Sequence, residues 1–152
     1  MPRVNTKKIK SAPSRLIFLI ALLGLLLFSN TFAPPKERSI YIGSQKILLE
    51  VVETQAEREK GLSGRKALTA NSGMLFVFEQ QGKHCFWMKD MNFPLDIIWL
   101  NSEKQIIHIV PNVKPATYPN DFCPDAPAKY VLELNAGQAQ ALDLLVGSRL
   151  SF

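Results

Sequence analysis

The segment Phe86–Asp96 holds the densest group of side chains in this chain that could perform chemistry. Large aromatic residues, Trp87 among them, surround the ionisable groups of Lys89 and Asp96, and Pro94 forces the residue before it toward extended backbone. Because rigid strands often hold functional groups at such bends, Lys89, Asp96 and Trp87 are candidate binding residues, and we expect that a turn here can bring the Lys89 ammonium and the Asp96 carboxylate together. The structural alternative is that Asp96 caps or pairs locally, Lys89 lies along aromatic faces and Trp87 belongs to the core.

A second acidic candidate is Glu133. It alternates with Leu132 and Leu134 in an apolar run, so its side chain is expected to point away from theirs if the run is a strand. It is then either solvated or part of a site. In an enzyme, Asp96 or Glu133 would be the general base, with Lys89 as its electrostatic partner.

Other catalytic and metal-binding patterns are weak. His84 and His108 are the two histidines, and neither has a metal-ligand spacing. The chain has no G-x-S-x-G turn for a nucleophilic serine and no glycine-rich phosphate loop. We therefore predict no metal and no cofactor.

Short apolar runs with turn residues between them predict the elements that must position these groups. We predict a mainly β (α+β) fold, a compact antiparallel β-sandwich or squashed barrel with two short helices, after an N-terminal apolar helix. One helix follows Thr54, which has capping-box spacing to Glu57, and the other covers Gly137–Leu145. The predicted strands are Ser39–Ile42, Lys46–Val52, Gly73–Phe78, His84–Met88, Leu95–Leu100, Gln105–Val110, Tyr130–Leu134 and Arg149–Phe152.

The N-terminal segment has the pattern of an export signal. Leu16–Phe28 is an uninterrupted apolar run, and five of the 18 Lys and Arg residues precede it without an acidic residue. The remaining 13 basic residues balance the 13 acidic ones, so the formal charge of +5 resides in the leader. The isoelectric point near 9.3 is therefore no sign of nucleic-acid binding, and we predict none.

The leader is either retained or cleaved. Thr31-Phe32-Ala33 has the small-x-small shape of a cleavage site, but Pro34 follows it directly. A retained leader would give a single-pass protein of the cytoplasmic membrane with its C-terminal domain outside. A cleaved leader would give a secreted or periplasmic protein. We divide the chain into an N-terminal signal or anchor segment (1–33), a linker (34–38) and one β domain (39–152).

Export bears on the two cysteines, Cys85 and Cys123. A pair of cysteines in an exported domain favours a disulfide between them. A free Cys85 packed as a small apolar residue and a redox or metal role are the alternatives.

Several motifs together resemble the DUF192 (UPF0127) family, in the family's order from about Lys46 to the C-terminus. They are Arg58-x-x-Gly61-Leu62-x-x-Arg65, Gly73-Met74-Leu75-Phe76, Phe86-Trp87-Met88-Lys89-Asp90, Pro94-Leu95-Asp96 and Tyr130-Val131-Leu132-Glu133-Leu134. The resemblance implies a small, mainly β domain and carries no catalytic assignment. It adds Arg58, Arg65 and Glu133 to the candidates, either for the same surface or for a buried ion network.

Three functions fit these observations. The first is a non-enzymatic domain at the cell envelope, attached to the membrane through its N-terminal segment, that binds a small molecule, glycan or peptide in a cleft rimmed by aromatics. The second is a hydrolase- or lyase-like enzyme. The third is a structural envelope module in which Arg58, Arg65, Lys89, Asp96 and Glu133 form an ion network.

The leader prediction is tested by fractionating cells and sequencing the mature N-terminus. We expect the full chain in the membrane fraction, with the domain accessible from outside. A soluble product beginning at Pro34 would contradict retention while leaving export standing, and a cytosolic product beginning at Met1 would contradict both.

Overall fold

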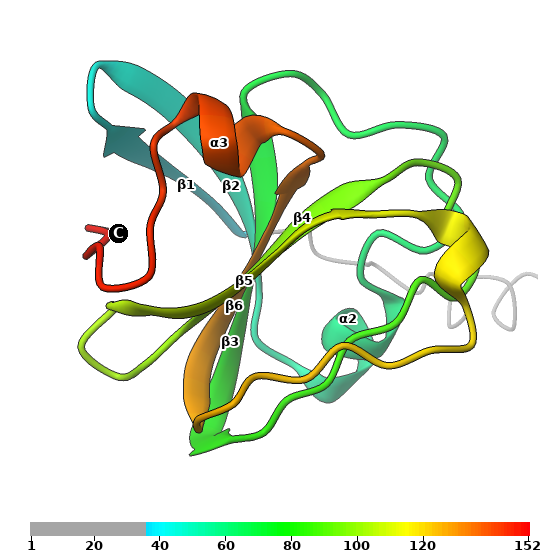
Figure 1. The fold of residues 1–152 in the computed structure, drawn as a ribbon. Coiled ribbons are helices and arrows are strands. Elements are labelled where there is room, and N and C mark those ends of the chain that lie inside the picture. The colour runs from blue at the N-terminus through cyan, green and yellow to red at the C-terminus, as the bar shows by residue number, and fades with distance from the viewer. Residues whose placement is uncertain (1–35) are drawn as a thin grey trace, which may run out of the picture. The chain divides into compact units, whose positions relative to one another are not determined.

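The computed structural model describes residues 36–152, so the predicted leader lies outside the described part of the chain. Six strands form one mixed sheet in the order β1-β2-β3-β6-β4-β5 (Figure 1). The strands are β1 (Lys36–Ile42), β2 (Gln45–Val52), β3 (Ser72–Gly82), β4 (Leu95–Leu100), β5 (Ile106–Val113) and β6 (Ala128–Asn135). The helices are α2 (Gln55–Lys60), the single 3₁₀ turn η1 (Pro115–Thr117) and α3 (Gln138–Ala141).

The prediction of a mainly β fold with two short helices is confirmed. The sheet is mixed rather than wholly antiparallel, because β2 and β3 run parallel, with Leu49 opposite Gly73. Parallel neighbours need a long crossover connection, and the segment that carries α2 supplies it. No residue larger than glycine fits at Gly73, since an added Cβ would lie 2.7 Å from Leu134 and 2.8 Å from the Glu133 carbonyl.

Four predicted elements differ from the structure, two in extent and two in being no strand. β3 continues past the predicted end at Phe78 to Gly82, and His84–Met88 is not a strand: its backbone pairs only at Phe86, with Phe122. α3 ends at Ala141, shortly before Asp143 takes a positive φ of 52° that no helix continues through. Arg149–Phe152 forms no strand and pairs only through Arg149 with Gln105.

The central strands are buried on both faces. Successive residues of a strand point to opposite faces, and neighbours such as Val131 and Leu132 belong to two different apolar clusters. One cluster includes Ala139 of α3, and the other includes Leu62 and Met88 from the loops around α2. We call these two sides the α3 face and the α2 face. Among residues 36–152, no helix combines the length and apolar composition needed to cross a membrane.

Asp96 lies on the α3 face and is fully buried. The register of β4 against β5 shifts between Leu95 and Ile97, and Asn112 opposite this shift has a positive φ of 51°. Asp96 Oδ1 accepts the backbone N–H of Asn112 at 2.8 Å, and Oδ2 accepts that of Ala139 at 2.8 Å. One carboxylate thus accepts hydrogen bonds from a backbone N–H group at the bulge of β5 and from another in the first turn of α3.

Asp96→Asn is expected to lower the free energy of unfolding by about 2–4 kcal/mol, since the amide would present its own N–H groups to one of these backbone donors. Urea denaturation of the full chain measures the loss. Asp125→Asn is the matched control, because the Asp125 side chain is 92% exposed; it should stay within about 0.5 kcal/mol of wild type. A loss below about 1 kcal/mol for Asp96→Asn would contradict the structural role.

Candidate functional site

A cavity of about 720 Å³ lies between α2, the turn that follows it and the segment 85–91. Four of the sequence candidates line it: Arg58, Trp87, Lys89 and Glu133. Asp96 and Arg65 do not. The other lining residues are Gln55, Glu59, Lys60, Gly61, Leu62, Ser63, Phe76, Phe78, Cys85, Phe86, Asp90 and Met91.

Arg58 fastens α2 to the sheet. The helix begins at the predicted capping box, in which the Thr54 hydroxyl accepts the Glu57 N–H and the Glu57 carboxylate accepts the Thr54 N–H. Arg58 Nη1 donates to the carbonyls of Glu53 and Val77, the latter at 3.0 Å, and the guanidinium lies 5.1 Å from the Phe78 ring centroid. Arg58 is thus a positioning residue whose hydrogen bonds are largely used within the wall.

Two turns are joined along one side of the cavity. The Ser63 hydroxyl donates to the Lys89 carbonyl at 3.0 Å, and the Gly64 N–H donates to the Asp90 carbonyl at 2.8 Å. The amide of Asn92 donates to the Arg65 carbonyl at 2.9 Å. These bonds hold the turn after α2 against the bend that the sequence singled out.

A disulfide also holds the segment 85–91 of the wall. Cys85 and Cys123 are bonded, with their Cα atoms 4.2 Å apart, and Cys85 lines the cavity. Next to them, Phe86 and Phe122 exchange two backbone hydrogen bonds of 2.8 Å. The segment 84–93 therefore keeps its shape without being a strand.

Glu133 forms the floor. Its strand neighbours across the sheet are Met74 and Ile97, both members of the apolar cluster on the α2 face. The residue is 5% exposed. Its carboxyl group has no hydrogen bond among residues 36–152, but it is not closed off from solvent, since the fully buried side-chain oxygen without a partner in these residues is Oε1 of Gln138. Burial raises the pKa of Glu133 from 4.5 to about 8, and the charge of Arg65 opposes this rise only in part. At neutral pH the carboxyl group is mostly protonated.

Arg65 is engaged elsewhere. Its guanidinium forms a two-pronged ion pair with Glu50 of β2, at 2.6 and 2.8 Å. Glu50, Met74 and Glu133 follow one another across β2, β3 and β6, so the ion pair of Arg65 with Glu50 is centred two strands away from Glu133. Because the Arg65 guanidinium is paired with the Glu50 carboxylate, its charge offsets the effect of burial on the pKa of Glu133 only in part.

The predicted meeting of Lys89 with Asp96 was wrong. The Lys89 ammonium lies 5.6 Å from the Trp87 ring centroid, while Asp96 is on the other face of the sheet. Arg58, Arg65, Lys89, Asp96 and Glu133 therefore form no single ion network within the described residues. Arg58, Arg65, Lys89 and Asp96 each contact a different group, and the Glu133 carboxyl group has no hydrogen bond or ion pair among the described residues.

Histidines take no part in this cavity. The His84 ring stacks on Phe78 at 3.5 Å, and His108 pairs with exposed Asp125 at 3.3 Å. In the described part of the chain, no group of three or more His, Cys, Asp or Glu side chains is arranged to hold a metal ion.

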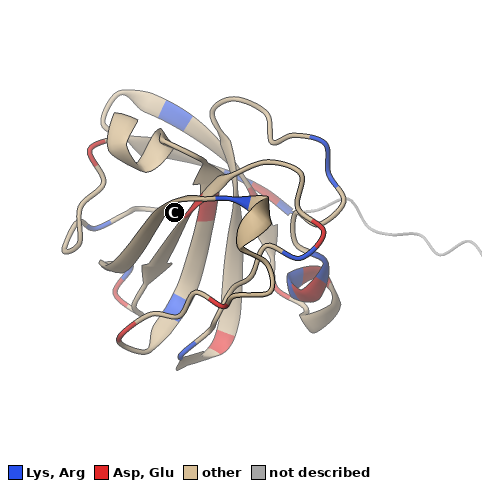
Figure 2. Cartoon of the chain, turned by 45° about the vertical axis from the view of Figure 1, so that its right-hand side comes forward, with Lys and Arg blue, Asp and Glu red and all other residues tan. Residues whose placement is uncertain are grey.

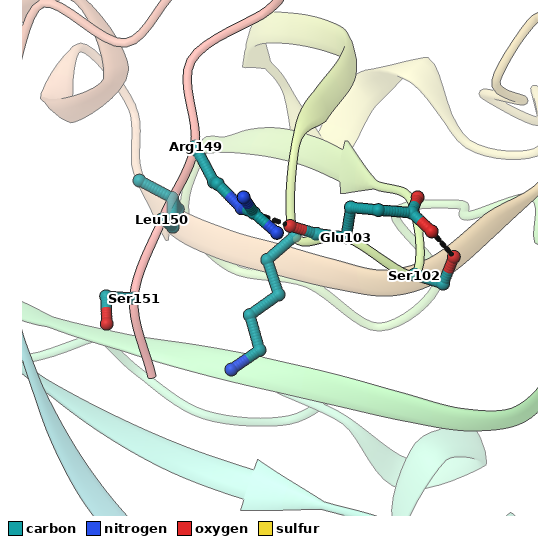
Figure 3. Close-up of a pocket in the computed structure, with 6 residues that line it drawn as sticks. Ser102, Glu103, Arg149, Leu150 and Ser151 are labelled. Carbon is teal, nitrogen blue, oxygen red and sulfur yellow. Dashed lines mark hydrogen bonds between the residues drawn. The ribbon is translucent and has the colours of Figure 1, made fainter.

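A smaller hollow of about 370 Å³ lies at the β4–β5 turn and the C-terminal segment (Figure 3). Its polar groups are bonded to one another: Ser102 to the Glu103 carboxylate at 2.6 Å, and Arg149 to the Glu103 carbonyl at 2.7 Å. It contains none of the sequence candidates, whereas four of them line the α2 cavity, so we take the α2 cavity as the candidate site.

Comparison with known proteins agrees with the motif resemblance. The model of the DUF192 family, described as "Uncharacterized ACR", matches residues 38–152. The chain belongs to the DUF192 family. A comparison with curated proteins finds no match to this chain.

Two solved structures are similar to this DUF192 domain. One is a "putative transcription regulator" from Sinorhizobium meliloti 1021, with 29% sequence identity and a TM-score of 0.72, covering 78% of this chain and 95% of that chain. The other is a protein of unknown function from Novosphingobium aromaticivorans DSM 12444, with 26% identity and a TM-score of 0.70, covering 82% of this chain and 89% of that chain. They support the fold and assign no chemistry to the cavity.

Sequence reasoning missed Glu59, Lys60 and Tyr118 in this DUF192 domain. Glu59 and Lys60 follow Arg58 on α2, and the capping box predicted that helix without saying which surface it covers. Tyr118 lies in a proline-bearing loop, and nothing near it in sequence shows that its ring contacts Trp87.

The raised pKa of Glu133 makes stability depend on pH. Between pH 4.5 and about 8 the unfolded chain releases this proton while the folded domain keeps it, so stability falls as pH rises, by up to about 1.4 kcal/mol per pH unit. Glu133→Gln, an uncharged isostere, should remove this fall, and the variant should surpass wild type above pH 8. Urea denaturation at a series of pH values measures both curves.

Glu59→Gln is the matched control, because it removes an exposed carboxyl group at the rim of the same cavity. Its curve should run parallel to that of wild type. A Glu133→Gln curve that is also parallel to wild type would contradict the shifted pKa.

Proposed function

We propose that this DUF192 domain is a small-molecule-binding module and that the ligand enters the α2 cavity. The observation that carries the proposal is the buried carboxyl group of Glu133, which reaches the cavity floor without a hydrogen-bond partner among residues 36–152. The carboxyl group is shielded from bulk water, so a ligand that offers it a hydrogen bond gains an interaction that the described residues do not supply.

The shape and lining of the cavity support the proposal. Its volume of about 720 Å³ lies within the range of about 300–1,000 Å³ typical of small-molecule sites. The wall combines six aromatic or aliphatic residues with eight polar or charged ones, so it offers apolar contacts and hydrogen bonds together. Three backbone or side-chain bonds and a disulfide hold the walls, so that little ordering remains to be done on binding.

We place this module at the cell envelope. The one-sided charge and the apolar run of residues 1–33 support export, with the segment either retained as a membrane anchor or cleaved. The balanced charge of the remaining chain gives little support to nucleic-acid binding, which depends mainly on Lys and Arg contacts to phosphate, in spite of the name of the Sinorhizobium neighbour.

Acid–base catalysis by Glu133 is the second candidate. A carboxyl group with a pKa of about 8 exchanges its proton near neutral pH, which suits a general acid or base. Asp96 has no part in such an enzyme, because both of its oxygens are bonded to backbone on the α3 face.

The binding proposal is tested by nuclear magnetic resonance on the ¹⁵N-labelled full chain, kept in a zwitterionic detergent. The probes are a panel of small fragments: neutral sugars, tripeptides and aromatic carboxylic acids. We expect at least one class to shift the amide signals of residues 55–63 and 85–91 in a saturable manner. Signals that stay unchanged, or that move only at residues 102–104 and 149–151 of the smaller hollow, would contradict the proposal.

A further inference from the structure

Two exposed aromatic side chains lie together beside the α2 cavity: Trp87 lines it, and Tyr118, outside the lining, contacts Trp87. Trp87 is 51% exposed and Tyr118 is 45% exposed, although large aromatic residues are usually covered in a folded domain. Their ring centroids are 5.7 Å apart at an interplanar angle of 65°. The disulfide and the Phe86–Phe122 pairing hold the two segments that carry them, so the pair is a fixed apolar surface beside the cavity.

The charges around the cavity are mixed. Three basic residues (Arg58, Lys60, Lys89) and three acidic residues (Glu59, Asp90, Glu133) line it. Figure 2 shows both signs of charge on α2 itself. Arg58 donates hydrogen bonds to backbone carbonyls, and the Lys89 ammonium lies over the Trp87 ring, so both side chains have contacts within the wall. This lining selects neither an anion nor a cation, and it offers hydrogen-bond donors and acceptors side by side.

The floor adds a group that can both donate and accept. With its pKa raised to about 8, the Glu133 carboxyl group carries a proton at neutral pH and keeps a free carbonyl oxygen. A hydroxyl group has the same double capacity, so the two can exchange a pair of hydrogen bonds. A ligand with an ammonium group would instead have to draw the proton off Glu133.

We propose that the α2 cavity binds the pyranose ring of a saccharide, with one face of the sugar against Trp87 and Tyr118 and a hydroxyl group directed to Glu133; this rests on the proposed function of the cavity. A pyranose ring carries C–H groups on its faces and hydroxyl groups around its edge. It therefore matches a cavity with an aromatic surface beside it and hydrogen-bond donors and acceptors within it.

A peptide fits this cavity less well. Peptides commonly bind by adding a strand to the free edge of a sheet. The edges of this sheet are β1 and β5, and neither contributes a residue to the cavity. Its walls come from a helix, two turns and the disulfide-bonded segment, and none of them offers a row of unpaired backbone groups.

Four pyranose disaccharides test the proposal: cellobiose, maltose, lactose and chitobiose. Each is titrated into the full chain in a detergent without a sugar headgroup, and the indole N–H signals of Trp87 and Trp99, the two tryptophans, are followed. Sorbitol is the negative probe, because it has the hydroxyl groups without a ring face. We expect at least one disaccharide to shift the Trp87 signal in a saturable manner, while sorbitol leaves it unchanged.

Variants locate the contact. Trp87→Ala should weaken binding about tenfold or more, Trp87→Phe should weaken it less, and Tyr118→Ala should fall between them. Tyr41→Ala is the matched control, since Tyr41 is a 66% exposed aromatic residue on β1, outside the cavity. Thermal unfolding of each variant checks that it is folded.

The saccharide proposal is overturned if no disaccharide shifts the Trp87 signal, or if Trp87→Ala binds as tightly as Tyr41→Ala. If tripeptides or aromatic acids then still shift the amides of residues 55–63 and 85–91, the cavity remains a binding site for another class of ligand. If no probe shifts them, the proposed function falls as well.

Discussion

A buried carboxyl group without a partner is the constraint on which this domain depends. Glu133 lies in the middle strand of the α2 face, between Met74 and Ile97, in a position where an apolar residue would pack without cost. Two features lower the free-energy cost of burying this group: it is protonated at neutral pH, and it lies at the floor of an accessible cavity. The cavity and the acidic group belong together. In a closed core the carboxyl group would be buried without any hydrogen-bond partner, whereas here it faces a cavity that a ligand can enter.

The surrounding structure keeps that cavity from collapsing. Loop side chains normally fill the space over a sheet, but here α2 is fastened by Arg58 and the two turns are joined through Ser63 and Gly64. The disulfide fixes the remaining wall at Cys85. Rigid walls of this kind are typical of preorganised binding sites, because the entropy of ordering is lost during folding rather than during binding.

Asp96 shows how similar residues acquire opposite roles. It and Glu133 are both buried acids in neighbouring strands, yet alternation directs them to opposite faces. On the α3 face Asp96 meets two backbone N–H groups left unpaired by a bulge and a helix start. A carboxylate with two bonded oxygens is a structural element, whereas one with none is a candidate for chemistry.

Sequence patterns predicted the local features well. The hairpin of β1 and β2, the capping box at Thr54 and the strand that holds Glu133 all follow from neighbouring residues. They could not predict that both faces of that strand are covered, since the covering residues Leu62 and Met88 lie far away in sequence. The partners of Asp96 are 16 and 43 residues away, so the sequence spacing to Lys89 was misleading. The segment 84–88 has the composition of a strand but has no neighbour to pair with except at Phe86, and composition alone does not supply a neighbour.

The central claim is that Glu133 is an uncharged carboxyl group at neutral pH. The most direct measurement is a pH titration of its side-chain carboxyl carbon by ¹³C nuclear magnetic resonance in the full chain, assigned by the signal that Glu133→Gln removes. The account predicts a midpoint near 8, and a midpoint near the ordinary value of 4.5 would contradict it.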